Sequence, residues 1–111
     1  VITKNKTTMG FFNRLTDFGD RELVRAHAAR IGVGLNQIEN ATSIPEIKGL
    51  SIAIKQEVQA MMLVALKLSR ESINCLDVNI NGTKIPFTMF VERLERESAR
   101  IVARGGFSII S

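Results

Sequence analysis

The chain has a single histidine, His27, and it is the first residue to consider as a catalyst or a metal ligand. A histidine acts as a general base beside a nucleophile, or it holds a metal ion together with further His, Cys or carboxylate ligands. The spacing of the sequence places no such group beside His27, whose charged neighbours are Arg25 and Arg30. We therefore expect a packed histidine, and neither an enzyme nor a bound metal or cofactor.

A second candidate for chemistry is a row of arginines near the end of the chain. Its four members recur at three- and four-residue steps: Arg93, Arg96, Arg100 and Arg104. On a helix this spacing places them within an arc of roughly 80°. Guanidinium groups bind phosphate and carboxylate groups in a forked geometry, so the row predicts a face for an anionic partner. The alternative is a solvated helix face, because three glutamates share the helix and the chain has no Trp or Tyr for base stacking.

A predicted apolar surface is the strongest sign of a binding site. Residues 60–66 are hydrophobic nearly all round a predicted helix. Such a helix is either sandwiched within the domain or lies in an interface. We predict a homodimer or larger oligomer centred on five residues: Ile52, Met61, Met62, Leu63 and Leu66. The alternative is that a hairpin of the same chain covers this side.

One long helix, residues 43–73, is expected to position these side chains. Ser43 and Glu46 form a capping box at its start, and only Gly49 interrupts the helix formers that follow. Apolar residues recur along its inner side at helical spacing: Ile47, Leu50, Ile54, Val58, Met61, Ala65 and Leu68. Such a helix spans about 45 Å, more than the diameter of about 35 Å expected for a chain of this size. We therefore expect it to project or to be covered by a partner.

The clearest local signal is a β-hairpin at residues 76–87. Apolar and polar side chains alternate on both sides of Asn81-Gly82, a dipeptide typical of a type I′ turn. A two-residue loop pairs Ile80 with Thr83 and Val78 with Ile85, on a face that we expect to be buried.

A last helix is expected at residues 88–104. Thr88 can cap its start, and Gly105-Gly106 can end it. The segment 107–110 after it is apolar enough to add a strand to the hairpin or to a second subunit.

The first forty residues carry weaker signals. Residues 1–8 are polar and expected to be flexible, and residues 9–18 fit either a helix or a short strand. A helix capped by Asp17 or Asp20 is expected to run to about residue 40. Gly32 and Gly34 interrupt it, and they indicate either a close helix crossing or a turn between two shorter helices.

Residues 28–38 resemble two families of DNA-binding proteins. Four residues follow the helix–turn–helix spacing: Ala28, Gly32, Val33 and Ile38. Residues 32–37 are also similar to the turn and second-helix start of ribbon–helix–helix proteins. This resemblance implies a dimeric DNA-binding regulator. The chain departs from it at His27, where the first family usually has an aliphatic residue, and at Glu39-Asn40, so no site residue is carried over.

Composition is that of an ordinary globular domain. The chain has 111 residues, of which 45% are hydrophobic and 23% charged, and its formal net charge of +4 suits acidic partners. No apolar run is long enough to predict a membrane span, and no signal peptide is visible. The lone Cys75 excludes an internal disulfide and favours the cytoplasm.

These features predict a mainly α (α+β) fold over residues 1–111, a single domain with one long central helix and a small antiparallel hairpin, as a dimer. The expected function is that of a small non-enzymatic regulatory or accessory protein. It would act by protein–protein binding as a homodimer and could inhibit or modulate its partner. The alternative is a dimeric DNA-binding regulator, with nucleic acid as the partner.

Overall fold

The computed structural model describes the backbone of residues 2–110 and the side chains of residues 17–110. Within these residues the chain forms four helices and one hairpin: α1 (Ile2–Glu39), α2 (Ile44–Ala65), α3 (Arg70–Asn74), β1 (Asp77–Ile80), β2 (Thr83–Pro86) and α4 (Phe87–Ala103). The predicted mainly helical α+β class is confirmed. No helix in the described part combines the length and the hydrophobicity that crossing a membrane requires.

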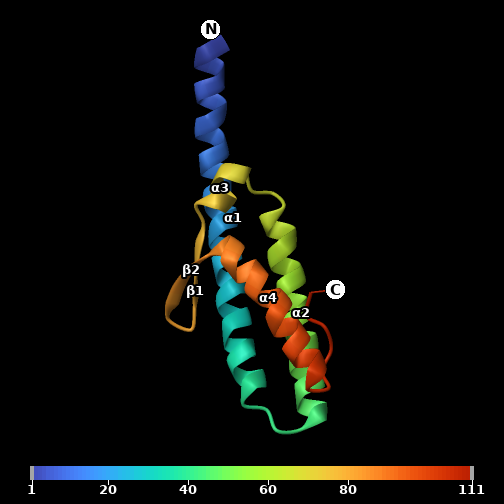
Figure 1. Cartoon of the computed structure of the whole chain (residues 1–111). Coiled ribbons are helices and arrows are strands. Elements are labelled where there is room, and N and C mark those ends of the chain that lie inside the picture. The colour runs from blue at the N-terminus through green and yellow to red at the C-terminus, as the bar shows by residue number, and fades with distance from the viewer. Residues whose placement is uncertain (1, 111) are drawn as a thin grey trace.

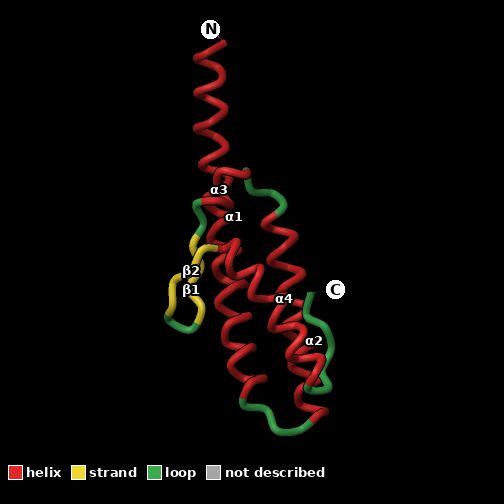
Figure 2. The backbone as a smooth tube through the Cα atoms, in the orientation of Figure 1, coloured by secondary structure: helices red, strands yellow, loops and turns green. Residues whose placement is uncertain are grey.

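The helices α1 and α2 form an antiparallel pair around which the other elements are arranged. The chain turns at residues 40–43 and returns along α1 as α2, and α4 crosses this pair (Figure 1). The hairpin lies beside α1, away from α2 (Figure 2). The largest buried side chains come from all of these elements: Val24 and Ile31 of α1, Met61 of α2, Val78 of β1, and Phe90, Leu94 and Ile101 of α4.

The longest helix is α1, which has 38 residues, and not the predicted helix at 43–73. The N-terminal part of α1 extends beyond the other elements (Figure 1), and the molecule measures 63 × 25 × 18 Å. Residues 43–73 form two shorter helices, so the prediction of one long helix there is wrong, whereas cover by a partner stays a prediction. The backbone of residues 2–8 is helical where a flexible segment is expected, and residues 9–18 are helix rather than strand.

The predicted helix 43–73 starts as expected but ends early. The hydroxyl of Ser43 accepts a hydrogen bond from the N–H of Glu46 at 3.3 Å, as the capping box requires. However, α2 ends at Ala65, and α3 begins after Ser69. Ser69 acts as the cap of a new helix, and its hydroxyl accepts from the N–H of Ser72 at 3.1 Å.

The side chain of Asp17 fixes the start of α3. Its carboxylate is buried and accepts hydrogen bonds from the hydroxyls of Ser72 at 2.7 Å and Ser69 at 2.9 Å. These bonds, with that from Ser72 as the largest cause, hold the pKa of Asp17 below its ordinary value against the effect of burial. Asp17 thus lies inside the continuous α1, where it fixes the start of α3, and the prediction that it caps a helix is wrong.

Gly32 and Gly34 mark close crossings rather than a turn, because α1 continues through both. A Cβ atom at Gly34 would lie 2.8 Å from Cγ1 of Ile54 in α2. At Gly32 it would lie 3.0 Å from Cγ2 of Ile80 in β1. The missing Cβ atoms let α2 and the hairpin approach α1 closely. The side chain of Asn81 fastens the hairpin there, donating to the carbonyl of Gly32 at 2.9 Å.

The hairpin has the predicted register. Its strands pair Asp77 with Pro86, Val78 with Ile85, Asn79 with Lys84, and Ile80 with Thr83. Asn81 and Gly82 have φ angles of 53° and 88°, the left-handed values of a type I′ turn. The buried side chains of Val78 and Ile80 face the α1 side of the fold. The hairpin therefore does not cover the outer side of α2, and that alternative is wrong.

The last helix, α4, begins at Phe87, so Pro86 and not Thr88 occupies the cap position, without a side-chain cap bond. It ends at Ala103, followed by Gly105 at φ 96° as predicted. Residues 107–110 form no strand with the hairpin, and that expectation is wrong. They form an irregular segment, in which Ile109 is fully buried.

Two buried serines hold this C-terminal segment against the helices. Ser51 of α2 accepts from the N–H of Phe107 at 3.0 Å, and Ser98 of α4 accepts from the N–H of Ile109 at 3.0 Å. The segment thus bridges α2 and α4, and in Figure 1 it lies beside α2. Because its N–H groups bond to side chains, it needs no neighbouring strand.

Candidate interaction surface

The predicted interface residues divide between the core and the surface. Ile52, Leu63 and Leu66 are exposed, at 47%, 65% and 79% of their surface. Met62 is half-buried. Met61 is fully buried at 0%, because its helical phase places it on the inner stripe of α2. The prediction that Met61 lies in a partner interface is therefore wrong.

The exposed residues of α2 belong to a longer row, which we call the outer seam of α2. It comprises Gly49, Ile52, Gln56, Gln59, Leu63 and Leu66, all exposed. Their steps alternate between three and four residues, the heptad spacing of a helix that packs along another helix. Of this row, the sequence predicted Ile52, Leu63 and Leu66 as interface residues, because those side chains are apolar.

Two hollows flank the outer seam. One, of about 560 Å³, lies over Ile52, Gln56 and Gln59, with Phe107 of the C-terminal segment lining it as well. The other, of about 450 Å³, lies at the end of α2, where Met62 and Leu66 meet a largely apolar lining from α3 and α4: Ile73, Phe87, Thr88 and Val91. The second hollow depends on the break between α2 and α3 and could not be predicted from a continuous helix.

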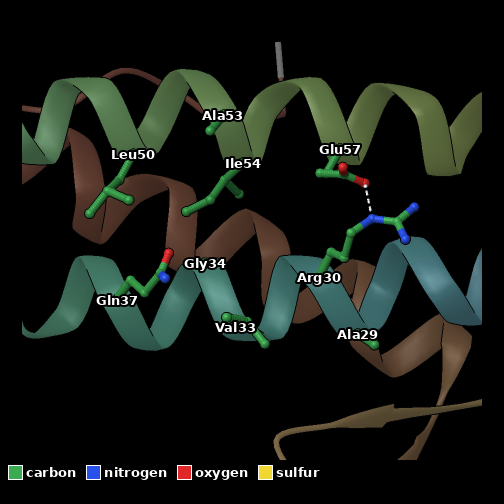
Figure 3. A pocket seen from close by; sticks show the side chains of 9 residues that line it. All are labelled: Ala29, Arg30, Val33, Gly34, Gln37, Leu50, Ala53, Ile54 and Glu57. Atoms are coloured by element: carbon green, nitrogen blue, oxygen red, sulfur yellow. Dashed lines mark hydrogen bonds and ion pairs between the residues drawn. The ribbon is translucent and has the colours of Figure 1, made fainter.

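A third hollow, of about 310 Å³, lies between α1 and α2 (Figure 3). Small and apolar residues line most of it: Ala29, Val33, Gly34, Leu50, Ala53 and Ile54. At one end, Arg30 of α1 reaches Glu57 of α2, with Nε of Arg30 3.2 Å from Oε2 of Glu57 (Figure 3).

His27 contacts both members of this ion pair and so links α1 to α2. Its Nδ1 atom lies 2.7 Å from Oε2 of Glu57 and 3.0 Å from Nη2 of Arg30. The hydrogen bond with His27 is the main reason that the pKa of Glu57 lies below its ordinary value; Arg30 adds to this, and burial opposes it. Within the described residues, no group of three or more His, Cys, Asp or Glu is arranged to hold a metal ion.

The row of four arginines is only partly available to an anion. Arg93 and Arg100 both lie near Oε1 of Glu97, at 3.9 and 3.3 Å. Arg104 donates to the carbonyl of Ile38, in the last turn of α1, at 2.7 Å and to that of Ala41, just beyond α1, at 2.8 Å. Its guanidinium therefore satisfies carbonyls at the C-terminus of α1. Arg96, Arg100 and Arg104 are all exposed, and the anion-binding face stays a prediction, in which the carbonyls of Ile38 and Ala41 already occupy the guanidinium of Arg104.

The segment that resembles DNA-binding families does not have their geometry. Both families need a turn between two helices within residues 28–38. Here α1 continues without interruption to Glu39. The expectation of a helix–turn–helix or ribbon–helix–helix element at this segment is therefore wrong.

Comparison with protein-family models, with curated proteins and with solved structures finds no match for this chain. The outer seam of α2 and the hollows beside it are thus the features from which a function can be inferred.

Proposed function

We propose that this protein is a small non-enzymatic accessory protein that acts by binding other protein chains and that assembles as a homodimer through the outer seam of α2. One observation carries the proposal. Ile52, Leu63 and Leu66 stand exposed on one side of one helix. Single exposed apolar residues are ordinary, whereas several on one face indicate an interaction site.

The hollow at the end of α2 offers a place for a partner protein. Its largely apolar lining suits a side chain of a bound helix or loop, since such anchors supply most of the binding energy in interfaces. Met62 gives this lining a flexible side chain that can adapt to the partner. The exposed Arg96 and Arg100 on α4 would orient an acidic partner by long-range attraction. Through this contact the protein would modulate the activity of its partner.

A charge-introducing variant tests the proposal. Leu63→Glu combined with Leu66→Glu places two carboxylates on the outer seam, and Val102→Glu on α4, where Val102 is 50% exposed, is the matched control. Light scattering should give about twice 12.3 kDa for the parent and the control, and 12.3 kDa for the double variant. A parent of 12.3 kDa would contradict the homodimer.

Capture of binding partners from the native host, followed by mass spectrometry, tests the second half of the proposal. The parent and the Val102→Glu control should retain one stoichiometric partner after nuclease treatment, and the double variant should lose it because Leu66 lines the hollow. If nuclease removes every captured protein, and the parent shifts duplex DNA in a gel with a steep salt dependence, DNA binding replaces this proposal.

A further inference from the structure

The outer seam of α2 has the same spacing in both directions. From Gly49 to Leu66 the steps are three, four, three, four and three residues, and the reversed order gives the same series. A helix with such a row can therefore face an antiparallel copy of itself, with a twofold axis passing between Gln56 and Gln59. Most homodimers have this symmetry, in which one patch contacts the same patch of its partner.

We propose that α2 pairs antiparallel with α2 of a second copy of this chain, in one defined register. Ile52 faces the partner's Leu63, Gln56 faces the partner's Gln59, and Gly49 faces the partner's Leu66. This inference rests on the proposed homodimer and adds to it the direction and register of the pairing.

Each facing pair is chemically matched. Ile52 and Leu63 bury apolar surface against one another on both sides of the axis. Gln56 and Gln59 each carry an amide donor and an acceptor, so they can bond across the axis. Nothing lies within 4 Å of the position that a Cβ atom of Gly49 would occupy, which leaves room for the partner's Leu66, the most exposed apolar side chain of the seam.

The central glutamines specify the register. A shift by one heptad in either direction would set Gln56 or Gln59 against an apolar residue or Gly49 and bury amide groups without partners, which is unfavourable. Parallel pairing would also align glutamines with glutamines. It would, however, set Gly49 against Gly49, leaving a void, and it would align the two helix dipoles side by side.

The residues beside the seam are compatible with this pairing. Ala53 and Ala60 line one edge, and their short side chains allow the two helices to approach closely. Lys55 and Met62 line the other edge, where Lys55 would meet the partner's Met62, so no two like charges face one another. The hollow of about 560 Å³ over Ile52, with Phe107 also in its lining, gives the partner's Leu63 a further apolar contact.

Disulfide linkage between single-cysteine variants tests the direction. Ile52→Cys and Leu63→Cys are each made on a Cys75→Ser background, because Cys75 is free and exposed. In the proposed register, a disulfide forms only when the two variants are mixed and oxidised. Identical cysteines would lie about 16 Å apart along the helix axis, beyond the limit of about 7 Å between bonded Cα atoms. Glu95→Cys, on the exposed side of α4, measures linkage by random collision.

A second mixture, of Gln56→Cys with Gln59→Cys, leaves every apolar residue of the seam in place and should also link more than either variant alone. If each single variant at position 52 or 63 forms disulfides by itself, and mixing the two does not increase the yield, antiparallel pairing is overturned. The proposed homodimer would still hold. A dimer by light scattering with no linkage above the Glu95→Cys level would place the contact elsewhere and overturn the register. A monomeric parent would overturn the proposed homodimer as well.

Discussion

The two sides of α2 both carry apolar residues at helical spacing, but their surroundings are opposite. On the inner side, Ile54, Val58 and Met61 are at most 5% exposed, packed within the core. On the outer side, Ile52, Leu63 and Leu66 are 47% to 79% exposed. The chain covers the inner side itself and leaves open the outer side, where Gly49, Gln56 and Gln59 also lie. The inner stripe should therefore determine stability, and the outer seam should determine association.

The largest expected effect on folding comes from the inner side. Met61→Ala removes a fully buried side chain and leaves a cavity, which should lower the free energy of unfolding by about 2 to 5 kcal/mol. Urea denaturation followed by circular dichroism, at a concentration low enough to dissociate any dimer, measures this change. A midpoint equal to that of the parent would show that the two sides of α2 do not differ as described.

Two glycine substitutions should change the free energy of unfolding by smaller amounts and in opposite directions, one at a packed position and one at an open position. Gly34→Ala forces a Cβ atom to within 2.8 Å of Ile54, and such overpacking should outweigh the gain in helix propensity by about 1 kcal/mol. Gly49→Ala meets no atom within 4 Å and should stabilise the monomer by about 0.5 to 1 kcal/mol. In thermal unfolding, the melting temperature of Gly34→Ala should therefore lie below that of the parent, and that of Gly49→Ala should lie above it. Equal shifts of the same sign would contradict the close crossing at Gly34.

The arginines of α4 allow a similar contrast. Arg104→Gln loses two charge-assisted hydrogen bonds to the carbonyls of Ile38 and Ala41 and should lower the free energy of unfolding by about 1 kcal/mol. Arg96→Gln is the control and should change it by less than about 0.5 kcal/mol, because the side chain is exposed. If both variants unfold alike in urea, Arg104 does not secure the end of α1.

The smallest effect on folding is expected on the outer seam. Leu63→Gln should change the free energy of unfolding of the monomer by no more than about 0.5 kcal/mol, because 65% of Leu63 is already exposed. The same substitution should weaken self-association at least tenfold, as measured by sedimentation over a concentration series. If the substitution destabilises the monomer and leaves self-association unchanged, the outer side of α2 contributes to folding and not to association, contrary to this account.

Local signals in the sequence predicted local structure well. Asn81-Gly82 carries its own turn conformation, so the hairpin and its register could be read directly. The capping box at Ser43 and the inner stripe of α2 were equally accessible. The start of α3 was not, because Asp17, a residue distant in sequence, binds Ser69 and Ser72 there through its carboxylate.

The candidate surface was predicted only in part for the same reason. Ile52, Leu63 and Leu66 could be recognised as surplus to one core stripe, but in a helix apolar nearly all round, hydrophobicity alone cannot assign Met61 to one side. The role of Arg104 depends on carbonyls at the far end of another helix, which no local pattern in the sequence reveals.

The mass of the unmodified protein in solution tests the central claim most directly. Sedimentation equilibrium over the micromolar range should show a mass that rises with concentration towards twice 12.3 kDa. A mass of 12.3 kDa at every concentration would show that the outer seam of α2 does not join two copies of this chain.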